Sequence, residues 1–170
     1  MSGAAWFETK RADGKQRESV EFFCKFLDVD CDRVAIENPV GIISGDYVKE
    51  WFPELSIKYG LPIKPTQTIQ PWMFGDNHAK TTCLWLKGLI ELVPQVTEEP
   101  ELEWFEWVEK KTGKVKRQPM WYAEAWLSGG KDRGKIRSRT FPGIAEAMAE
   151  QWGNYITKGE VPVGTQFSFW

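Results

Sequence analysis

Apolar side chains near the start of the chain recur at the spacing of one helix face. This spacing predicts an amphipathic helix that packs against a sheet. A β-branched run at Val34, Ala35 and Ile36 then predicts a buried strand, and a second apolar run at residues 83–86 predicts another. A helix followed by a strand is half of a repeating α/β unit, so the expected fold class is α/β. The helical positions are Val20, Phe23, Cys24 and Leu27.

The segment between the two predicted strands is long and is punctuated by proline and glycine. A loop of more than about 15 residues in a compact domain is usually functional or disordered. Aromatic residues within this segment argue against disorder, so a functional loop is expected. They are Trp51, Phe52, Trp72 and Phe74.

After Pro94 the chain becomes acidic, then aromatic, and then passes through a Lys-Lys-Thr-Gly-Lys turn. This order predicts a hairpin-like insert at residues 98–130 within a single domain that spans residues 1–170. Thr140 and Pro142 provide a helix start signal, and the apolar stripe that follows predicts a mainly structural helix. The stripe comprises Ile144, Ala145, Met148, Ala149, Trp152 and Tyr155.

Glu37 and Asn38 come directly after the first predicted strand. Side chains just past the carboxyl end of a buried strand line the crevice in which α/β proteins bind their ligands. A carboxyl group beside a carboxamide can present a donor and an acceptor together, which suits the edge of a nucleobase. Capping of a local turn is the alternative for this pair, since such residues commonly bond the nearby backbone.

The composition indicates an ordinary globular chain. Of the 170 residues, 42% are hydrophobic and 27% charged, which is enough to bury one core of moderate size. The net charge of −2 restricts any contact with DNA to a local patch. Three irregularly spaced cysteines and a single histidine do not make a zinc site, so no metal is expected and a reduced, cytoplasmic setting fits. The chain shows neither a signal peptide nor a long apolar run, so membrane insertion is not expected.

Two basic groups could supply a local patch for DNA. The Lys-Lys-Thr-Gly-Lys turn and a later cluster that includes Arg137 and Arg139 could track a phosphate backbone. A solvated surface is the alternative for both groups. Most of the ten tryptophans are expected in the core, whereas Trp104 and Trp107 lie in an acidic region and could face a partner. His78 lies among polar residues and is expected on the surface without a catalytic role.

Gln70, Trp72 and Asp76 form a further candidate group. Hydrogen bonding and stacking by these side chains could shape a pocket for a base or a cofactor. The alternative is a packed loop, because a tryptophan next to a proline commonly anchors a loop against the core.

Five segments, in a fixed order, carry a likeness to known proteins. They are residues 1–14, with Met-Ser-Gly-Ala-Ala-Trp-Phe and Lys-Arg-Ala-Asp-Gly; residues 36–41, Ile-Glu-Asn-Pro-Val-Gly; residues 69–76, Ile-Gln-Pro-Trp-Met-Phe-Gly-Asp; residues 83–89, Cys-Leu-Trp-Leu-Lys-Gly-Leu; and residues 137–145, Arg-Ser-Arg-Thr-Phe-Pro-Gly-Ile-Ala. Together they resemble a family of bacteriophage proteins described as DNA cytosine methyltransferase-like. They span nearly the whole chain, and residues 98–126 are the least recognisable part.

The resemblance implies a partial Rossmann-like methyltransferase fold, with S-adenosylmethionine as cofactor and DNA as partner. In such enzymes a cysteine thiolate adds to C6 of a flipped cytosine while a glutamic acid holds or protonates N3, so that C5 can take the methyl group. Glu37 resembles that glutamic acid, with its neutral form favoured by partial burial, and Asn38 resembles the residue that supports the site's geometry. The expected substrate-binding residues are Gln70, Trp72, Asp76, Arg137 and Arg139.

The chain departs from the family pattern ahead of the first of these segments. It lacks the glycine-rich cofactor turn and the Pro-Pro-Cys nucleophile loop. None of Cys24, Cys31 and Cys83 follows a proline, so none is assigned as the nucleophile, and no cofactor-binding residue is named. The expectation is the later part of a methyltransferase fold, inactive alone, which acts in the host cytoplasm with an upstream-encoded half or as a homo-oligomer. The alternative is a non-catalytic DNA- or protein-binding remnant of the same fold.

Overall fold

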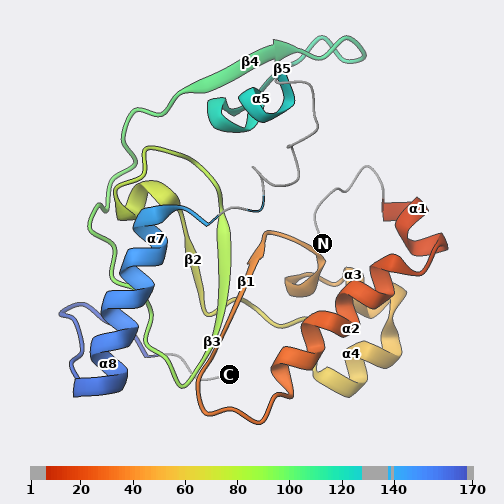
Figure 1. Ribbon diagram of the computed structural model, residues 1–170. Coiled ribbons are helices and arrows are strands. Elements are labelled where there is room, and N and C mark those ends of the chain that lie inside the picture. Colours follow the sequence, from red (N-terminus) through yellow and green to blue (C-terminus); the bar gives the residue numbers. More distant parts are fainter. Residues whose placement is uncertain (1–6, 128–137, 139, 168–170) are drawn as a thin grey trace. The chain divides into compact units, whose positions relative to one another are not determined.

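In a computed structural model, residues 7–127, 138 and 140–167 of the chain are described (Figure 1). These residues form two compact units. The first unit comprises the described residues up to Ile69, together with Thr81–Glu91 and the described residues from Glu160 onward. The second comprises the described residues of Gln70–Lys80 and Leu92–Gly159.

The first unit contains a three-stranded sheet with the strand order β1-β3-β2. Both outer strands run antiparallel to the central strand, and Asn38 and Thr68 each pair with Cys83. Residues 82–86 of the central strand are all buried, as expected for an apolar run with both faces covered. The strands are β1 (Val34–Pro39), β2 (Gln67–Ile69) and β3 (Thr82–Lys87).

The predicted mixed α/β class is confirmed, whereas a Rossmann-like sheet is not. Among the described residues every pair of strands is antiparallel. A Rossmann-like fold is instead built on mostly parallel strands that are joined by crossover helices. Both strands predicted from apolar runs are present, as β1 and β3.

Helix α2 packs against the sheet of the first unit. Its residues Val20, Phe23 and Cys24 are buried, as the apolar period predicts. The rings of Phe23 and Trp85 meet edge-on with their centroids 5.0 Å apart, and the indole Nε1 of Trp85 donates to the Ile63 carbonyl oxygen at 3.1 Å. The described helices of this unit are α1 (Phe7–Ala12), α2 (Lys15–Leu27), the 3₁₀ helix η2 (Ile42–Ser44), α3 (Tyr47–Trp51) and α4 (Pro53–Tyr59).

The prediction of one long loop between the first two strands is wrong, because short helices occupy much of this segment. Pro53 is the first residue of α4. Proline is tolerated there because the first backbone amides of a helix have no hydrogen-bond partner within the helix. Gly60 ends the same helix in the left-handed conformation, with a φ of 66°. Proline and glycine therefore mark helix ends here. Phe52 and Trp72 are buried, in line with an ordered segment.

The second unit combines a hairpin with short helices. The predicted hairpin is a two-stranded antiparallel sheet in which Trp104 pairs with Pro119 and Val108 with Val115. Gln151 bonds both backbone groups of Val93: its Oε1 accepts from the amide at 2.8 Å, and its Nε2 donates to the carbonyl at 3.0 Å. The described elements are the 3₁₀ helix η3 (Pro71–Phe74), β4 (Trp104–Val108), β5 (Val115–Pro119), α5 (Met120–Leu127), α7 (Pro142–Ala147), the π-helical η4 (Met148–Trp152) and α8 (Gly153–Lys158).

The predicted helix after Pro142 is present as three consecutive segments, α7, η4 and α8. Ile144 and Ala147 are buried, whereas Ala145 and Ala149 are exposed. The predicted stripe is therefore wrong at Ala145 and Ala149. Ile144 and Ala147 already define the buried side of α7, and the π-helical turn that follows changes the number of residues per turn.

Candidate functional site

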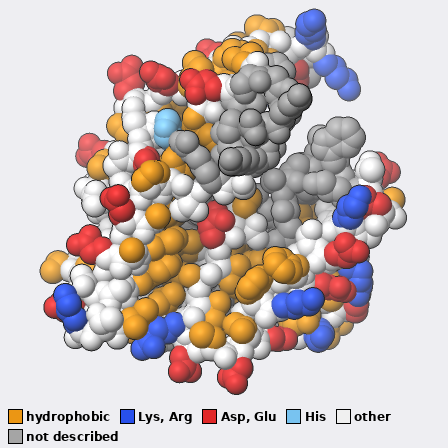
Figure 2. Space-filling view, in the orientation of Figure 1, with side chains coloured by type: hydrophobic (Ala, Val, Ile, Leu, Met, Phe, Trp, Pro, Cys, Tyr) orange, Lys and Arg blue, Asp and Glu red, His pale blue; other side chains and the backbone are white. Residues whose placement is uncertain are grey.

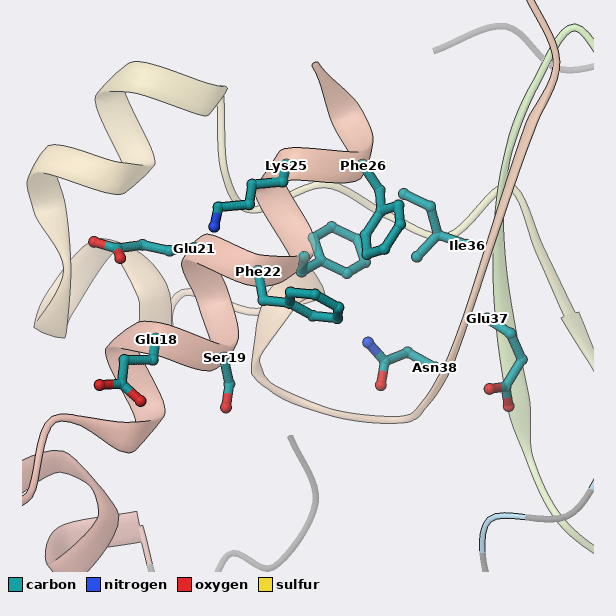
Figure 3. A pocket seen from close by; sticks show the side chains of 10 residues that line it. Glu18, Ser19, Glu21, Phe22, Lys25, Phe26, Ile36, Glu37 and Asn38 are labelled. Atoms are coloured by element: carbon teal, nitrogen blue, oxygen red, sulfur yellow. The ribbon is translucent and has the colours of Figure 1, made fainter. Parts of the chain in front are cut away.

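A pocket of about 590 Å³ lies between helix α2 and strand β1 in the first unit (Figure 3). Its volume lies within the range of about 300–1,000 Å³ that is usual for small-molecule sites. The wall combines phenyl rings, carboxylates and a carboxamide. The residues that matter most for its chemistry are Ser19, Phe22, Phe26, Ile36, Glu37 and Asn38.

Three phenylalanines of α2 line the pocket, of which Phe23 is buried and the other two are exposed. The rings of Phe22 and Phe26 meet edge-on with their centroids 5.1 Å apart. Both side chains are exposed, at 62% and 40% of their surface. Exposed aromatic rings beside a cavity offer a surface on which a flat ring can stack. Phe22 and Phe26 lie outside the buried stripe of the helix and were therefore not predicted as site residues; their i, i+4 spacing was the available signal.

Glu37 and Asn38 lie within β1 and not beyond it, because the strand extends to Pro39. Side chains alternate along a strand, so these neighbours point to opposite faces. In Figure 3 the Asn38 carboxamide points toward Phe22, on the same side as Ile36, whereas the Glu37 carboxylate points away from them. Asn38 is half-buried and Glu37 is exposed, so the expected partial burial of Glu37 is wrong. The Asn38 carboxamide is therefore the polar group that faces the phenylalanine rings in this pocket.

Acidic side chains dominate the charge around this pocket. Glu18, Glu21 and Glu37 line it together with one basic residue, Lys25. Glu21 also pairs with Arg17, whose Nε lies 2.9 Å from Glu21 Oε1. The surplus of carboxylates disfavours a phosphate group and favours a neutral or positively charged ligand.

The two buried cysteines are held as neutral thiols. Burial raises the pKa of Cys24 to about 11, and burial also raises the pKa of Cys83. Cys31 is exposed, and its thiol donates to the Arg33 carbonyl oxygen at 3.2 Å. Because the thiolate is the nucleophilic form, Cys24 and Cys83 are poorly suited to attack a base.

The raised pKa of Cys24 predicts a loss of stability in alkali. The ordinary pKa is 9.0 and the folded value is about 11, so the folded state keeps the proton that the unfolded state releases. The stabilisation is fully present below pH 9 and is lost as the pH rises through about 11. Urea unfolding of the wild type should show this fall, and Cys24→Ala should show a smaller one.

The exposed Cys31 provides the matched control for that measurement. Cys31→Ala should follow the pH dependence of the wild type between pH 9 and 11. An identical fall in stability for the wild type and Cys24→Ala would show that the buried thiol does not contribute.

Gln70, Trp72 and Asp76 all belong to the second unit. Gln70 Oε1 accepts a hydrogen bond from the backbone amide of Lys80 at 2.9 Å, and Asp76 Oδ2 accepts one from the amide of Gly143 at 2.8 Å. Trp72 is buried within η3. These contacts fit the packed-loop alternative, and contact of the three residues with a substrate stays a prediction.

Arg137 and Arg139, the other predicted substrate contacts, lie outside the described residues. His78 is half-buried, which differs from the expected surface position. Its ring centroid lies 5.3 Å from that of Phe141 and 6.4 Å from that of Trp121. In the part of the chain that the structure describes, no three His, Cys, Asp or Glu side chains gather as metal ligands. Over the same residues, no helix has both the length and the apolar character needed to cross a bilayer.

The described residues do not fit S-adenosylmethionine in the expected manner. A strand, a glycine turn and a helix should follow one another, with backbone amides facing the cofactor. Strand β1 instead leads through Gly41 into the three-residue η2, and Gly14, which precedes α2, follows helix α1. No residue is therefore assigned to the cofactor.

No protein-family model matches the chain, and no curated protein or solved structure is significantly similar to it.

Proposed function

We propose that the chain is a DNA cytosine methyltransferase-like protein of phage type, which receives a flipped cytosine in the pocket between α2 and β1. The observation that carries this proposal is the presence of an inward-pointing carboxamide, two exposed phenyl rings and a nearby carboxylate around one cavity. Enzymes that act on a flipped base hold it by stacking and by hydrogen bonds to its edge. The resemblance of the five segments supports the same function. This proposal includes a partial Rossmann-like fold. It also includes the host cytoplasm as the place where the protein acts.

In this proposal Asn38 bonds the edge of the cytosine and Phe22 supplies the stacking surface. The acidic surroundings favour a cytosine that carries a proton at N3, because its positive charge is attracted to the carboxylates. Glu37 is the proposed acid for N3; this role comes from the resemblance, because its carboxylate points away from Phe22 and Asn38. Gln70, Trp72, Asp76, Arg137 and Arg139 remain the proposed further contacts to DNA.

The thiolate that attacks C6 must come from another polypeptide segment in this proposal. Cys24 and Cys83 are buried thiols with raised pKa values, and Cys31 does not line the pocket. A homo-oligomer would repeat the same three cysteines. An upstream-encoded half is therefore the proposed partner, and the methyl donor, S-adenosylmethionine, would bind there.

Binding of an extrahelical cytosine tests the pocket directly. The full chain should bind a duplex with one unpaired cytosine more tightly than the same duplex with an unpaired thymine. Asn38→Ala and Phe22→Ala should each reduce the affinity by about 5- to 150-fold, which corresponds to about 1–3 kcal/mol for a stacked or bidentate base contact. Fluorescence anisotropy measures all four affinities.

Ile57→Ala is the matched control, because Ile57 is 86% exposed on α4 and does not line the pocket. It should leave the preference for cytosine unchanged. Equal affinity of the wild type for cytosine and thymine would contradict the proposed function.

A non-catalytic DNA- or protein-binding protein is the second candidate. The raised pKa values of Cys24 and Cys83 favour it, as does the position of Cys31 outside the pocket, because the pocket then has no thiolate of its own. In this case DNA affinity should fall on neutralisation of Arg137 and Arg139 and should be indifferent to Glu37→Gln.

A further inference from the structure

The β4–β5 hairpin of the second unit is basic, whereas the segment just before it in the sequence is acidic. Residues 104–119 carry five basic side chains against two acidic ones, which leaves three positive charges in a chain whose net charge is −2. The segment that leads into the hairpin is acidic instead. The basic residues are Lys110, Lys111, Lys114, Lys116 and Arg117, all exposed; Glu106 and Glu109 are the acidic ones within the hairpin; and Glu98, Glu99, Glu101 and Glu103 precede it.

A hydrogen-bonded turn holds the basic end of the hairpin in place. The amide of Glu109 donates to the Lys114 carbonyl at 2.9 Å, and the amide of Gly113 donates to the Glu109 carbonyl at 2.8 Å. Gly113 has a φ of 68°, a left-handed conformation that glycine adopts without strain. Lys110 and Lys111 are therefore presented on an ordered turn. Basic side chains gather at this end of the ribbon in Figure 2.

Aromatic side chains cover both faces of the ribbon behind this turn. Phe105 and Trp107 stack on one face with their ring centroids 6.1 Å apart, and Trp107 remains 39% exposed. On the other face the Arg117 guanidinium lies 4.4 Å from the centre of the Trp104 ring, which orders this charge by a cation–π contact. Both aromatic groups stiffen the two-stranded sheet.

We propose that the β4–β5 hairpin is a DNA-contacting ribbon whose lysine-bearing turn binds the phosphate backbone of duplex DNA. Charge complementarity selects a polyanion, and the major groove of a duplex is wide enough to admit a two-stranded β-ribbon. The inference rests on the proposed function only for the choice of DNA as the polyanion. The hairpin and the cytosine pocket belong to different units of the chain, so each can be tested separately.

Salt-dependent binding to a cytosine-free duplex tests the ribbon. The full chain is titrated against a fluorescent duplex of A·T pairs at several salt concentrations, and anisotropy gives the affinity. The triple variant Lys110→Gln, Lys111→Gln, Lys114→Gln should bind about tenfold more weakly or worse at low salt. In a plot of log affinity against log salt concentration, the magnitude of its slope should be smaller by about 2 to 3. Each lost phosphate contact removes about 0.9 from that slope.

The matched control removes three charges elsewhere. Lys49→Gln, Lys58→Gln, Lys64→Gln alters exposed lysines of the first unit and should bind like the wild type. An equal loss in both triple variants would overturn the proposal, as would an affinity without salt dependence. Tighter binding to the single strands of the same duplex would also overturn it, because the site would then serve unpaired DNA. If the chain shows no preference for an unpaired cytosine but keeps the expected salt dependence, the proposed function of the pocket is contradicted and the DNA-binding role of the hairpin is not.

Discussion

Glu37→Gln is expected to abolish methyl transfer to cytosine while leaving the fold intact. Glutamine keeps the size and one acceptor oxygen of the side chain but cannot give a proton to N3. Loss of a general acid commonly reduces a rate by about 10²- to 10⁴-fold. Glu37 is exposed on β1, so the substitution removes no core contact. Circular dichroism should therefore be unchanged.

The measurement uses the full chain and the donor that the resemblance implies. Labelled S-adenosylmethionine, cytosine-containing DNA and a protein segment with the glycine-rich turn and the Pro-Pro-Cys loop are mixed with the wild type or a variant. Glu50→Gln is the matched control, because Glu50 is exposed on α3 and does not line the pocket. It should retain transfer.

Two results would change the interpretation. Equal transfer by Glu37→Gln and the wild type would remove the acid role from Glu37. No transfer by the complemented wild type would remove the catalytic function and favour the DNA- or protein-binding alternative.

Trp85→Ala is expected to lower the free energy of unfolding by about 3–5 kcal/mol, the usual range for truncating a buried tryptophan. Trp85 is 2% exposed in the centre of the first unit. Its ring meets Phe23 of α2, and its Nε1 bonds the Ile63 carbonyl oxygen. The truncation therefore removes apolar burial, an aromatic contact and a hydrogen bond together. Urea unfolding followed by circular dichroism measures the change.

Trp85→Phe separates packing from hydrogen bonding in this core. The phenyl ring keeps most of the aromatic burial and leaves the Ile63 carbonyl without its donor, which costs about 1–3 kcal/mol. Ile57→Ala, at an exposed position of α4, should change the stability by less than about 0.5 kcal/mol. A Trp85→Ala variant as stable as Ile57→Ala would contradict this core assignment.

Local sequence signals predicted the elements that depend on neighbours in the chain. The i, i+3, i+4, i+7 spacing of apolar residues predicted α2, and Val20, Phe23 and Cys24 at these positions are buried. The apolar run at residues 83–86 predicted β3. The Lys-Lys-Thr-Gly-Lys turn between aromatic and polar runs predicted the β4–β5 hairpin, because a short turn brings its own two strands together.

The candidate site was predicted only in part. The sequence located Glu37 and Asn38 but placed them beyond the strand, where they could face one ligand together. Strand β1 remains paired with β3 as far as Pro39, so the side chains of Glu37 and Asn38 point to opposite faces of the sheet. Phe22 and Phe26 were missed because nothing in a helical pattern shows which exposed residues border a cavity.

The sequence by itself determined the apolar stripe of α2, the apolar run of β3 and the hairpin, since each follows from side-chain period or turn chemistry within a few residues. Only the tertiary structure decided the antiparallel order β1-β3-β2 and the face to which Asn38 points. These properties depend on which distant segments pair and pack, and local patterns of hydrophobicity do not specify strand partners or register.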